Sequence, residues 1–323
     1  MSGAATADLQ AKADVLHEAL PWIKRFAGRT AVIKYGGAAM SHQGERTTEA
    51  NDDKGAPIND AGSFVDDVVL LRYVGVDVVV VHGGGPEVSH AMKELGREPV
   101  FVDGHRVTDA DTIDLVRMIL VGRINKGLVG RFNRHGRLAV GLSGEDGLLV
   151  SAAPRHDPGG RELGFVGDVA AVDTTALRAI TGAGLIPVIA TVAAGPDGRP
   201  YNVNADAVAG ALAAALGAEK LVYLTDVEGL YRDIADPRSL LRRITLAEVE
   251  ALLEGSQAHS RMAPKLRGIV TALRAGVGSA HILDGRLRHA LLLELFTDQG
   301  VGTMVGPNGW DQSESSDAKE GVA

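Results

Sequence analysis

The stretch VVVVHGGGPEV, from Val78 to Val88, joins four consecutive valines to three consecutive glycines and a proline. An unbroken β-branched run of this kind predicts a strand that is buried on both faces, as in a parallel sheet. Glycine costs backbone entropy, so three together indicate that something approaches the main chain where a side chain would obstruct it. Pro86 fits the first turn of a following helix, where no N–H is needed. Exposed N–H groups at such a junction are a usual binding place for phosphate.

The same glycines partly match a dinucleotide-binding pattern. Gly83 and Gly85 occupy the first two glycine positions of G-x-G-x-x-G, and Asp103 follows at the distance expected for a ribose-binding carboxylate. Val88 stands at the third glycine position, which weakens the match. A dehydrogenase therefore remains an alternative that requires NAD to bind the Gly83 loop. A tight turn without any ligand is a second alternative.

A second glycine loop favours polyphosphate over a dinucleotide. The first expected strand, in AVIKYGGAAM, carries Lys34 and then Gly36 and Gly37, so a lysine and a bare loop are expected at the same edge of the sheet. Two phosphate-sized openings indicate that a polyphosphate is handled there. The pattern G-x-x-x-x-G-K-[ST] does not occur in the sequence, so the chain is not a P-loop enzyme.

Polar residues in the second half of the chain complete a candidate phosphoryl-transfer site. Asn202, Asn204 and Asp206 precede or begin an Ala-rich helix, and Lys265 lies at the start of another helix, where a lysine is unfavourable for the macrodipole. Transfer of a phosphoryl group needs negative charge stabilised at both ends, which Lys34, Lys265 and Mg²⁺ would provide, with Asp206 between the lysines. The alternative is that Asn204 and Asp206 only cap the helix.

Other candidate groups are weaker. Arg106 in DGHRVTD is a candidate clamp for a carboxylate, because its planar fork matches that group, or else an ion-paired surface arginine. Ser143 does not meet the G-x-S-x-G pattern of a hydrolase nucleophile. The histidines show no metal-ligand spacing, so His82 and His105 are expected to be structural and no protein metal site is predicted.

The composition is that of a globular chain. Its 323 residues are 45% hydrophobic, enough to bury one large core or two modest ones. Cysteine is absent, which excludes disulfides, thiolate nucleophiles and thiolate metal sites. The net charge of −8 argues against nucleic acid as a partner. The sequence shows neither an apolar run of membrane-spanning length nor a secretory signal, so we expect no membrane partner and a cytoplasmic location.

Strand-like and helix-like segments alternate along the chain, which predicts a mostly parallel sheet covered by helices on both faces. The expected strands lie in TAVIKYGG, VDVVVVHGGG, RLAVGLSG, IPVIATV, EKLVYLTDV, SAHIL and GTMV. An amphipathic helix over 8–26, with its apolar stripe at Leu9, Leu16, Leu20 and Ile23, precedes the first strand. The polar segment 41–62 is expected to be a mobile loop, and the tail over 306–323 is expected to be disordered.

Together the motifs resemble those of N-acetylglutamate kinases, a branch of the amino-acid kinase family, over about residues 9–305. In chain order they are KYGG, VHGGGPEV, GHRVTD, INKGLVGRFNRHG, GLSGEDG, LGFVGDV, IPVIA, NVNADAVAGALA, LVYLTDVEG, MAPK, HILDGR and LLLELFTDQGVGTM. The resemblance implies an α/β fold, a three-layer αβα sandwich with an open central sheet in residues 28–305. It also implies MgATP over the C-terminal half, N-acetyl-L-glutamate over the N-terminal half, and phosphorylation of the substrate's side-chain carboxylate in arginine synthesis.

The resemblance also assigns roles to individual residues. The groups implied at the transferring phosphoryl are Lys34, Lys265 and Asp206, with main-chain donors at Gly37, Gly84 and Gly85. The groups implied for the acylated substrate are Arg106 and Asn202, together with Gly84 and Gly85. Those implied for the nucleotide are Gly36, Gly37, Thr225 and Asp226, with the two lysines. Mg²⁺ would be held mainly by the nucleotide phosphates.

The helix over 8–27, DLQAKADVLHEALPWIKRF, is similar to the extra helix of the arginine-inhibited, hexameric branch, in which it joins dimers into a ring. The resemblance therefore implies a homo-oligomer, a dimer or a trimer of dimers, and inhibition by arginine bound near Glu294 and Gly300. A helix packed on its own subunit is the alternative. The sequence departs from the usual motifs of the family at Ala38, at HSRMAPK and in the 41–62 insert. These departures leave two alternatives open: a kinase for a related acylated or carrier-linked amino acid, or a catalytically silent sensor of nucleotide or arginine.

Overall fold

The computed structural model describes residues 3–36, 61–102, 104–157, 159–160, 162–233, 235–255, 262–297 and 300–309. Several sequence predictions concern positions outside these ranges: Gly37, Ala38, most of the 41–62 insert, Asp103, the first residues of HSRMAPK and the tail from residue 310. Those predictions stay predictions. Gly306, which we expected to begin the disordered tail, instead ends strand β16 (Thr303–Gly306). Residues 61 and 62, which we expected in the loop, instead begin helix α3 (Ala61–Tyr73).

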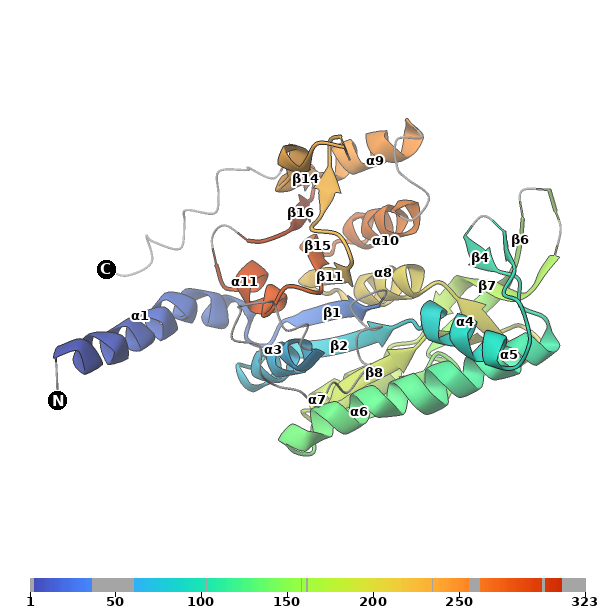
Figure 1. Cartoon of the computed structure of the whole chain (residues 1–323), viewed down its shortest axis with the longest axis horizontal. Coiled ribbons are helices and arrows are strands. Elements are labelled where there is room, and N and C mark those ends of the chain that lie inside the picture. Colours follow the sequence, from blue (N-terminus) through green and yellow to red (C-terminus); the bar gives the residue numbers. More distant parts are fainter. Residues whose placement is uncertain are drawn as a thin grey trace.

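The centre of the molecule is an eight-stranded sheet with the order β14-β16-β15-β11-β1-β2-β8-β5 (Figure 1). All neighbours are parallel except β15 and β16, which are antiparallel. The strands are β14 (Arg243–Thr245), β16 (Thr303–Gly306), β15 (Ser279–Asp284), β11 (Lys220–Thr225), β1 (Thr30–Tyr35), β2 (Asp77–His82), β8 (Ile186–Ala190) and β5 (Ala139–Ser143). The seven expected strands are all present in this sheet, and β14 is the one strand of this sheet that the sequence analysis missed.

The valines of β2 alternate between two hydrophobic clusters on opposite faces of this sheet. Val79 and Val81 belong to one cluster, and Val78 and Val80 to the other. All four are fully buried. Because successive side chains of a strand point to opposite faces, an uninterrupted apolar run is required only where both faces are covered. This arrangement confirms the mostly parallel α/β architecture expected from the sequence.

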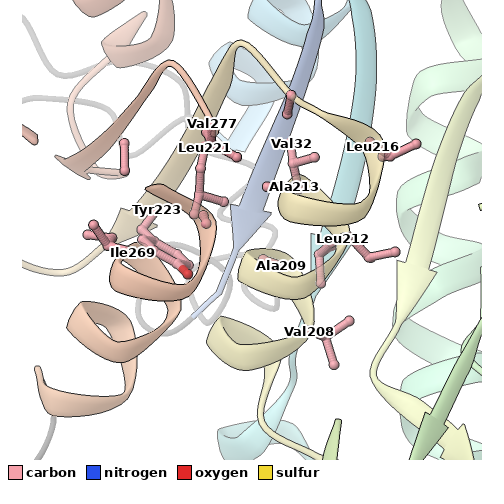
Figure 2. Packing of buried hydrophobic residues seen from close by; sticks show 14 of the residues in the cluster. Val32, Val208, Ala209, Leu212, Ala213, Leu216, Leu221, Tyr223, Ile269 and Val277 are labelled. Carbon is pink, nitrogen blue, oxygen red and sulfur yellow. The ribbon is translucent and has the colours of Figure 1, made fainter. Parts of the chain in front are cut away.

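Helices cover both faces of the sheet. The face that includes Val79 is covered by α7 (Thr175–Gly182), α8 (Ala205–Leu216), α9 (Leu246–Glu254) and α10 (Ala263–Arg274). Figure 2 shows part of this layer, where Val208 and Leu212 of α8 and Ile269 of α10 lie over β1 and β11. The opposite face is covered by α3, by α6 (Lys126–Phe132) and by α11 (Ala290–Leu295).

A second set of elements extends beyond the sheet on the side of β2 and β8. It includes a small closed barrel of β6 (Val150–His156), β7 (Glu162–Val172), β9 (Val192–Ala194) and β10 (Pro200–Val203). Beside it lie α4 (Gly85–Glu94) and the hairpin of β3 (Phe101–Val102) and β4 (His105–Arg106) (Figure 1). A continuous helical segment runs through α5 (Ala110–Arg117), the π-helix η1 (Met118–Asn125) and α6. Short elements complete the described chain: η2 (Asn133–His135), η3 (Asp146–Leu148), β12 (Leu230–Tyr231), η4 (Pro237–Ser239) and β13 (Leu240–Leu241).

Helix α1 (Gly3–Phe26) precedes the sheet and projects away from it (Figure 1). The helix expected over 8–26 is therefore present and begins earlier than predicted. Its C-terminal residue Phe26 is buried in the core, whereas Leu16 remains 72% exposed. Within the described part of the chain, no helix has both the length and the apolar character needed to cross a bilayer.

Candidate functional site

The ends of three neighbouring strands gather the first group of candidate residues. Lys34 lies near the end of β1, with Val81 of β2 and Tyr223 of β11 as its register partners. The glycine run follows β2 directly, and Thr225 is the last residue of β11. Both predicted loops therefore emerge beside Lys34. This carboxyl edge is where open α/β sheets bind ligands.

Asp206 lies between two lysine ammonium groups. Lys34 Nζ is 3.0 Å from Asp206 Oδ1, and Lys265 Nζ is 3.2 Å from Asp206 Oδ2. The Lys265 ammonium donates a hydrogen bond to the carboxylate. The Lys34 ammonium lies at a similar distance from the other carboxylate oxygen and forms an ion pair with it. The structure thus brings together the three charged residues that the sequence analysis assigned to phosphoryl transfer.

Burial makes the charges of this cluster strong. All three side chains are largely withdrawn from solvent. Burial by itself raises the pKa of Asp206. The two ammonium groups lower this pKa by a larger amount, so the pKa lies below its ordinary value. Asp206 is therefore ionised at neutral pH. Two ammonium groups and one carboxylate leave one net positive charge, which favours an anionic ligand.

Gly36 makes room for the Lys34 ammonium. A Cβ atom on Gly36 would lie 2.8 Å from Lys34 Nζ and 3.0 Å from Lys34 Cε. Such an atom would push the end of the lysine side chain away from its position beside Asp206. The sequence analysis assigned Gly36 to the nucleotide, and the structure adds this local reason for a glycine.

The glycines that follow β2 differ in their surroundings. A Cβ on Gly83 would make an ordinary contact of 3.5 Å with Ala205 at the start of α8, whereas one on Gly84 would lie 2.3 Å from Ile124 of η1. A Cβ on Gly85 would meet no atom of the described chain within 4 Å. Gly84 is thus required by packing, and Gly85 faces open space. As the N-cap of α4, Gly84 supplies no side-chain hydrogen bond, which leaves the first N–H groups of that helix available to a ligand.

His82 fixes the first peptide of this loop. Its Nδ1 lies 2.9 Å from the carbonyl oxygen of Gly83, which can only accept, so Nδ1 carries the proton. Its Nε2 then accepts from the side-chain amide of Asn125 at 3.1 Å, and burial lowers the pKa of His82 to about 4, which keeps the ring neutral. Because a trans peptide points its C=O and N–H in opposite directions, the N–H of Gly84 is turned away from the ring. His82 is structural, as expected, and it orients a predicted donor.

Arg106 is a buried cation with neutral partners. Its Nη2 donates to the carbonyl of Gly85 at 2.8 Å and to Ser89 Oγ at 2.7 Å, and Nη1 lies 3.2 Å from Met92 Sδ. Its guanidinium carbon lies 4.8 Å from the centre of the Phe101 ring. None of the described carboxylates forms an ion pair with it, and burial lowers its pKa. Arg106 is therefore a buried arginine without an ion-pair partner among the described residues, and a carboxylate ligand could supply the opposite charge.

The asparagines before α8 have separate places. Asn204 is the N-cap of α8, and its Oδ1 accepts from the N–H groups of Asp206 at 2.8 Å and Ala207 at 3.1 Å. Asn202 lies half-buried in β10, where it pairs with Val166 of β7. The capping interpretation of Asn204 is thus correct, and it coexists with the lysine contacts of Asp206.

The predicted nucleotide residues lie at the end of β11. Thr225 is buried and donates from Oγ1 to Asp226 Oδ1 at 3.1 Å, while Asp226 is exposed. The carbonyl of Thr225 accepts from the N–H of Gly285, which follows β15, at 2.8 Å. This loop follows β11, on one side of β1 in the sheet, whereas Arg106 contacts Gly85, which follows β2 on the other side of β1.

Glu294 and Gly300, the candidates for an effector site, lie against each other. Glu294 Oε1 accepts from His281 Nδ1 at 2.7 Å, and Oε2 accepts from the N–H groups of Val301 at 2.7 Å and Gly302 at 3.0 Å. Gly300 has φ +60°, and a Cβ there would lie 2.7 Å from Glu294 Oε2. Both the backbone conformation and the space therefore require glycine.

This cluster extends to residues that the sequence analysis missed. His281 Nε2 lies 3.1 Å from Ser279 Oγ, which accepts from Lys220 Nζ at 2.7 Å. Lys220 Nζ in turn lies 5.3 Å from the centre of the Phe26 ring at the end of α1. Burial lowers the pKa of Lys220 to about 8. The available signal was a lysine, a serine and a histidine inside otherwise apolar strands, each of which needs a buried partner.

The sequence comparisons agree with the site geometry. The profile of the amino acid kinase family matches residues 29–284. The acetylglutamate kinase of Symbiobacterium thermophilum is 53% identical over 300 residues, covering 91% of this chain and 97% of its own. The acetylglutamate kinase of Acidothermus cellulolyticus is 50% identical over 309 residues, covering 93% of this chain and 98% of its own.

Solved structures show the same architecture. N-acetylglutamate synthase from Neisseria gonorrhoeae, complexed with coenzyme A and N-acetyl-glutamate, superposes with a TM-score of 0.74 at 27% identity. The match covers 92% of this chain and 64% of the synthase, so this chain spans somewhat less than two thirds of that protein. Carbamate kinase from Giardia lamblia bound to AMP-PNP superposes with a TM-score of 0.59 at 17% identity, covering 87% and 99% of the two chains. At that identity the second likeness concerns the fold alone.

The Glu294 cluster predicts a pH-dependent stability. Burial acts to raise the pKa of Glu294, but His281 and the two main-chain N–H groups outweigh it and hold the pKa at about 2, below the ordinary value of 4.5. A depressed carboxyl pKa stabilises the folded state above pH 4.5, and this stabilisation is lost as the pH falls toward 2. Glu294→Gln should lower the free energy of unfolding by about 3 kcal/mol at pH 7.

Urea denaturation at pH 7 and pH 3 measures this difference. The gap between wild type and Glu294→Gln should narrow at pH 3. The exposed Glu98→Gln serves as control and should show no comparable gap at either pH. A Glu294→Gln gap that is the same at both pH values would contradict the assignment.

Proposed function

The chain belongs to the amino acid kinase family, and on this premise we propose that it phosphorylates the side-chain carboxylate of N-acetyl-L-glutamate with ATP, a step of arginine biosynthesis. The products are N-acetyl-L-glutamyl 5-phosphate and ADP. The observation that carries the proposal is the pair of ammonium groups that share Asp206 at the carboxyl edge of the sheet. The names of the curated relatives support the same substrate.

The site suits phosphoryl transfer without a protein nucleophile. A carboxylate oxygen of the acceptor would bond to the γ-phosphorus of ATP while the bond to the β,γ-bridging oxygen breaks, so that ADP leaves with the electron pair. Negative charge spreads over the transferring group and the leaving oxygen. Lys34 and Lys265 would stabilise that charge, and Asp206 would keep both lysines close together and protonated. The uncapped N–H groups at the start of α4 would bind the equatorial oxygens.

The two substrates would approach this centre from opposite sides. Arg106, which lacks an anionic partner among the described residues, would bind the free carboxylate of the acetylated amino acid, and Asn202 would bind its amide. ATP would lie over the loops after β1 and β11, near Thr225 and Asp226. Bound Mg²⁺ would neutralise part of the phosphate charge. We expect the phosphates to be its principal ligands.

Removing either lysine tests the catalytic assignment. Lys34→Ala and Lys265→Ala should each lower kcat by about a hundredfold or more, because an interaction of roughly 3 kcal/mol with the transition state is lost. The measurement is ADP release in a coupled assay with N-acetylglutamate and MgATP. Lys93→Ala, on the exposed side of α4, removes a lysine away from the centre and should keep wild-type activity.

The same assay distinguishes the alternatives. Equal or faster turnover of another acylated or carrier-linked amino acid would contradict N-acetylglutamate as the substrate. Thermal stabilisation by ATP or arginine without ADP release would identify a silent sensor. Stabilisation by NAD would revive the dehydrogenase interpretation.

We infer further that arginine inhibits the enzyme and that α1 joins dimers into a hexamer in the cytoplasm. On α1, Val15 is 64%, Leu16 72% and Leu20 40% exposed, so these three side chains are not covered by the described part of the same subunit. The stripe is therefore available to a second copy of the chain. The buried path from Phe26 at the end of α1 through Lys220 and His281 to Glu294 would link this interface to the effector site.

Substitution of the α1 stripe tests the assembly. Leu16→Asp combined with Leu20→Asp should convert a hexamer into dimers in light scattering, since two charges would be buried in the interface. Glu18→Gln, on the same exposed stretch of α1, is the control and should keep the larger assembly. An unchanged mass for the double variant would contradict the role of the stripe.

Glu294→Gln tests the effector site. The variant should need about tenfold more arginine for half-inhibition, because the loop at 300–302 loses a charged anchor. Inhibition curves at fixed substrate measure the shift. Equal arginine sensitivity in the variant and in wild type would place the inhibitor elsewhere.

A further inference from the structure

Helices α8 and α10 together carry two of the three charged residues of the centre. Asp206 lies in the first turn of α8, and Lys265 lies in the first turn of α10. The helices approach each other at two glycines: a Cβ on Gly210 would lie only 2.6 Å from the carbonyl oxygen of Gly268. Close backbone contact of this kind leaves little freedom in the spacing of the two helices. The distance between the carboxylate and the Lys265 ammonium depends on that spacing.

Tyr223 reaches from the sheet into this contact. In β11, Tyr223 is the register partner of Lys34 in β1. Figure 2 shows the Tyr223 ring beside α10, with its hydroxyl directed toward α8. The hydroxyl donates to the main-chain carbonyl of Asp206 at 2.8 Å. A Cβ on Gly268 would lie 2.3 Å from this hydroxyl oxygen and 2.8 Å from the same carbonyl. The missing side chain at Gly268 is what allows the hydroxyl to reach Asp206.

The environment keeps this hydroxyl a donor. Tyr223 is fully buried, and burial together with the nearby charge of Asp206 raises the pKa of its hydroxyl well above the ordinary value. The hydroxyl is therefore protonated at neutral pH. Its bond adds to the helical hydrogen bond that the carbonyl of residue 206 accepts from the residue four positions later.

We propose that Tyr223 is a positioning residue for phosphoryl transfer: its hydroxyl fixes the main chain of Asp206, and thereby the carboxylate, between the ammonium groups of Lys34 and Lys265. The inference rests on the proposed kinase function. Tyr223 does not touch the reacting atoms, and it acts through Asp206. Asn204 holds the first turn of α8 through the N–H groups of Asp206 and Ala207, and the Tyr223 hydroxyl holds the same turn through the carbonyl of Asp206. A hydrogen bond from Tyr223 ties that turn to β11, the strand that pairs directly with the strand of Lys34.

Tyr223→Phe tests the inference with the loss of one oxygen atom. We expect kcat to fall about tenfold, because a small displacement of catalytic charge is costly, while KM for ATP and N-acetylglutamate stays within about twofold. Tyr73→Phe is the matched control, since the Tyr73 side chain is 65% exposed and its hydroxyl lies 3.4 Å from the carbonyl of His135. A Tyr223→Phe variant with wild-type kcat, or with a change confined to KM, would overturn the proposal.

A double-mutant cycle with Gly268→Ala gives a second readout. Alone, Gly268→Ala should lower kcat, because its Cβ would displace the Tyr223 hydroxyl. In the Tyr223→Phe background the same substitution should lower kcat by a smaller factor, since the hydroxyl is already gone. Factors that simply multiply would overturn the inference. Failure of the kinase proposal itself would appear differently, as wild-type protein that releases no ADP with N-acetylglutamate.

Discussion

Two ammonium groups that share one buried carboxylate are the interaction on which the site depends. Without Asp206, two lysine side chains held close together in a buried place would repel each other. With Asp206, each lysine has an anionic partner in a region that excludes most water. The one remaining positive charge is then available to a group that brings negative charge. The cluster is thus stable without a ligand and attractive to one.

The rest of the fold serves to hold these three side chains together. Lys34 comes from the central strand of the sheet, Asp206 from α8 and Lys265 from α10, so each is carried by a different element. The sheet places Lys34 on the same face as α8, because Val32, two residues earlier, belongs to the cluster beneath that helix. Glycines at 36, 210 and 268 remove the side chains that would separate the charged groups or their helices. Close approach, not flexibility, explains these glycines.

The sequence contains most of the architecture but only part of the site. The valines of β2 and the strand–helix alternation follow from burial on both faces, so they can be read directly from apolar patterns. Lys34, Asp206 and Lys265 could be proposed from local chemistry and from the family resemblance. Neither source could give the contact of Tyr223 with Asp206 or the path from Lys220 to Glu294, because these depend on the register of β1, β11 and β15. Strand β14 is short and partly polar, and its pairing with β16 is visible only in three dimensions.

The start of α4 joins the two cationic parts of the site. On one side its first N–H groups lack a side-chain cap, and Gly85 faces open space. On the other side the carbonyl of Gly85 accepts from Arg106, so the buried guanidinium is attached to the same turn. A molecule with a carboxylate at each end could therefore bind Arg106 with one end and the uncapped N–H groups at the start of α4 with the other. An acetylated amino acid with an acidic side chain has this form. Because both binding groups belong to the same turn, the site would select a ligand by the distance between its two carboxylates rather than by either carboxylate alone.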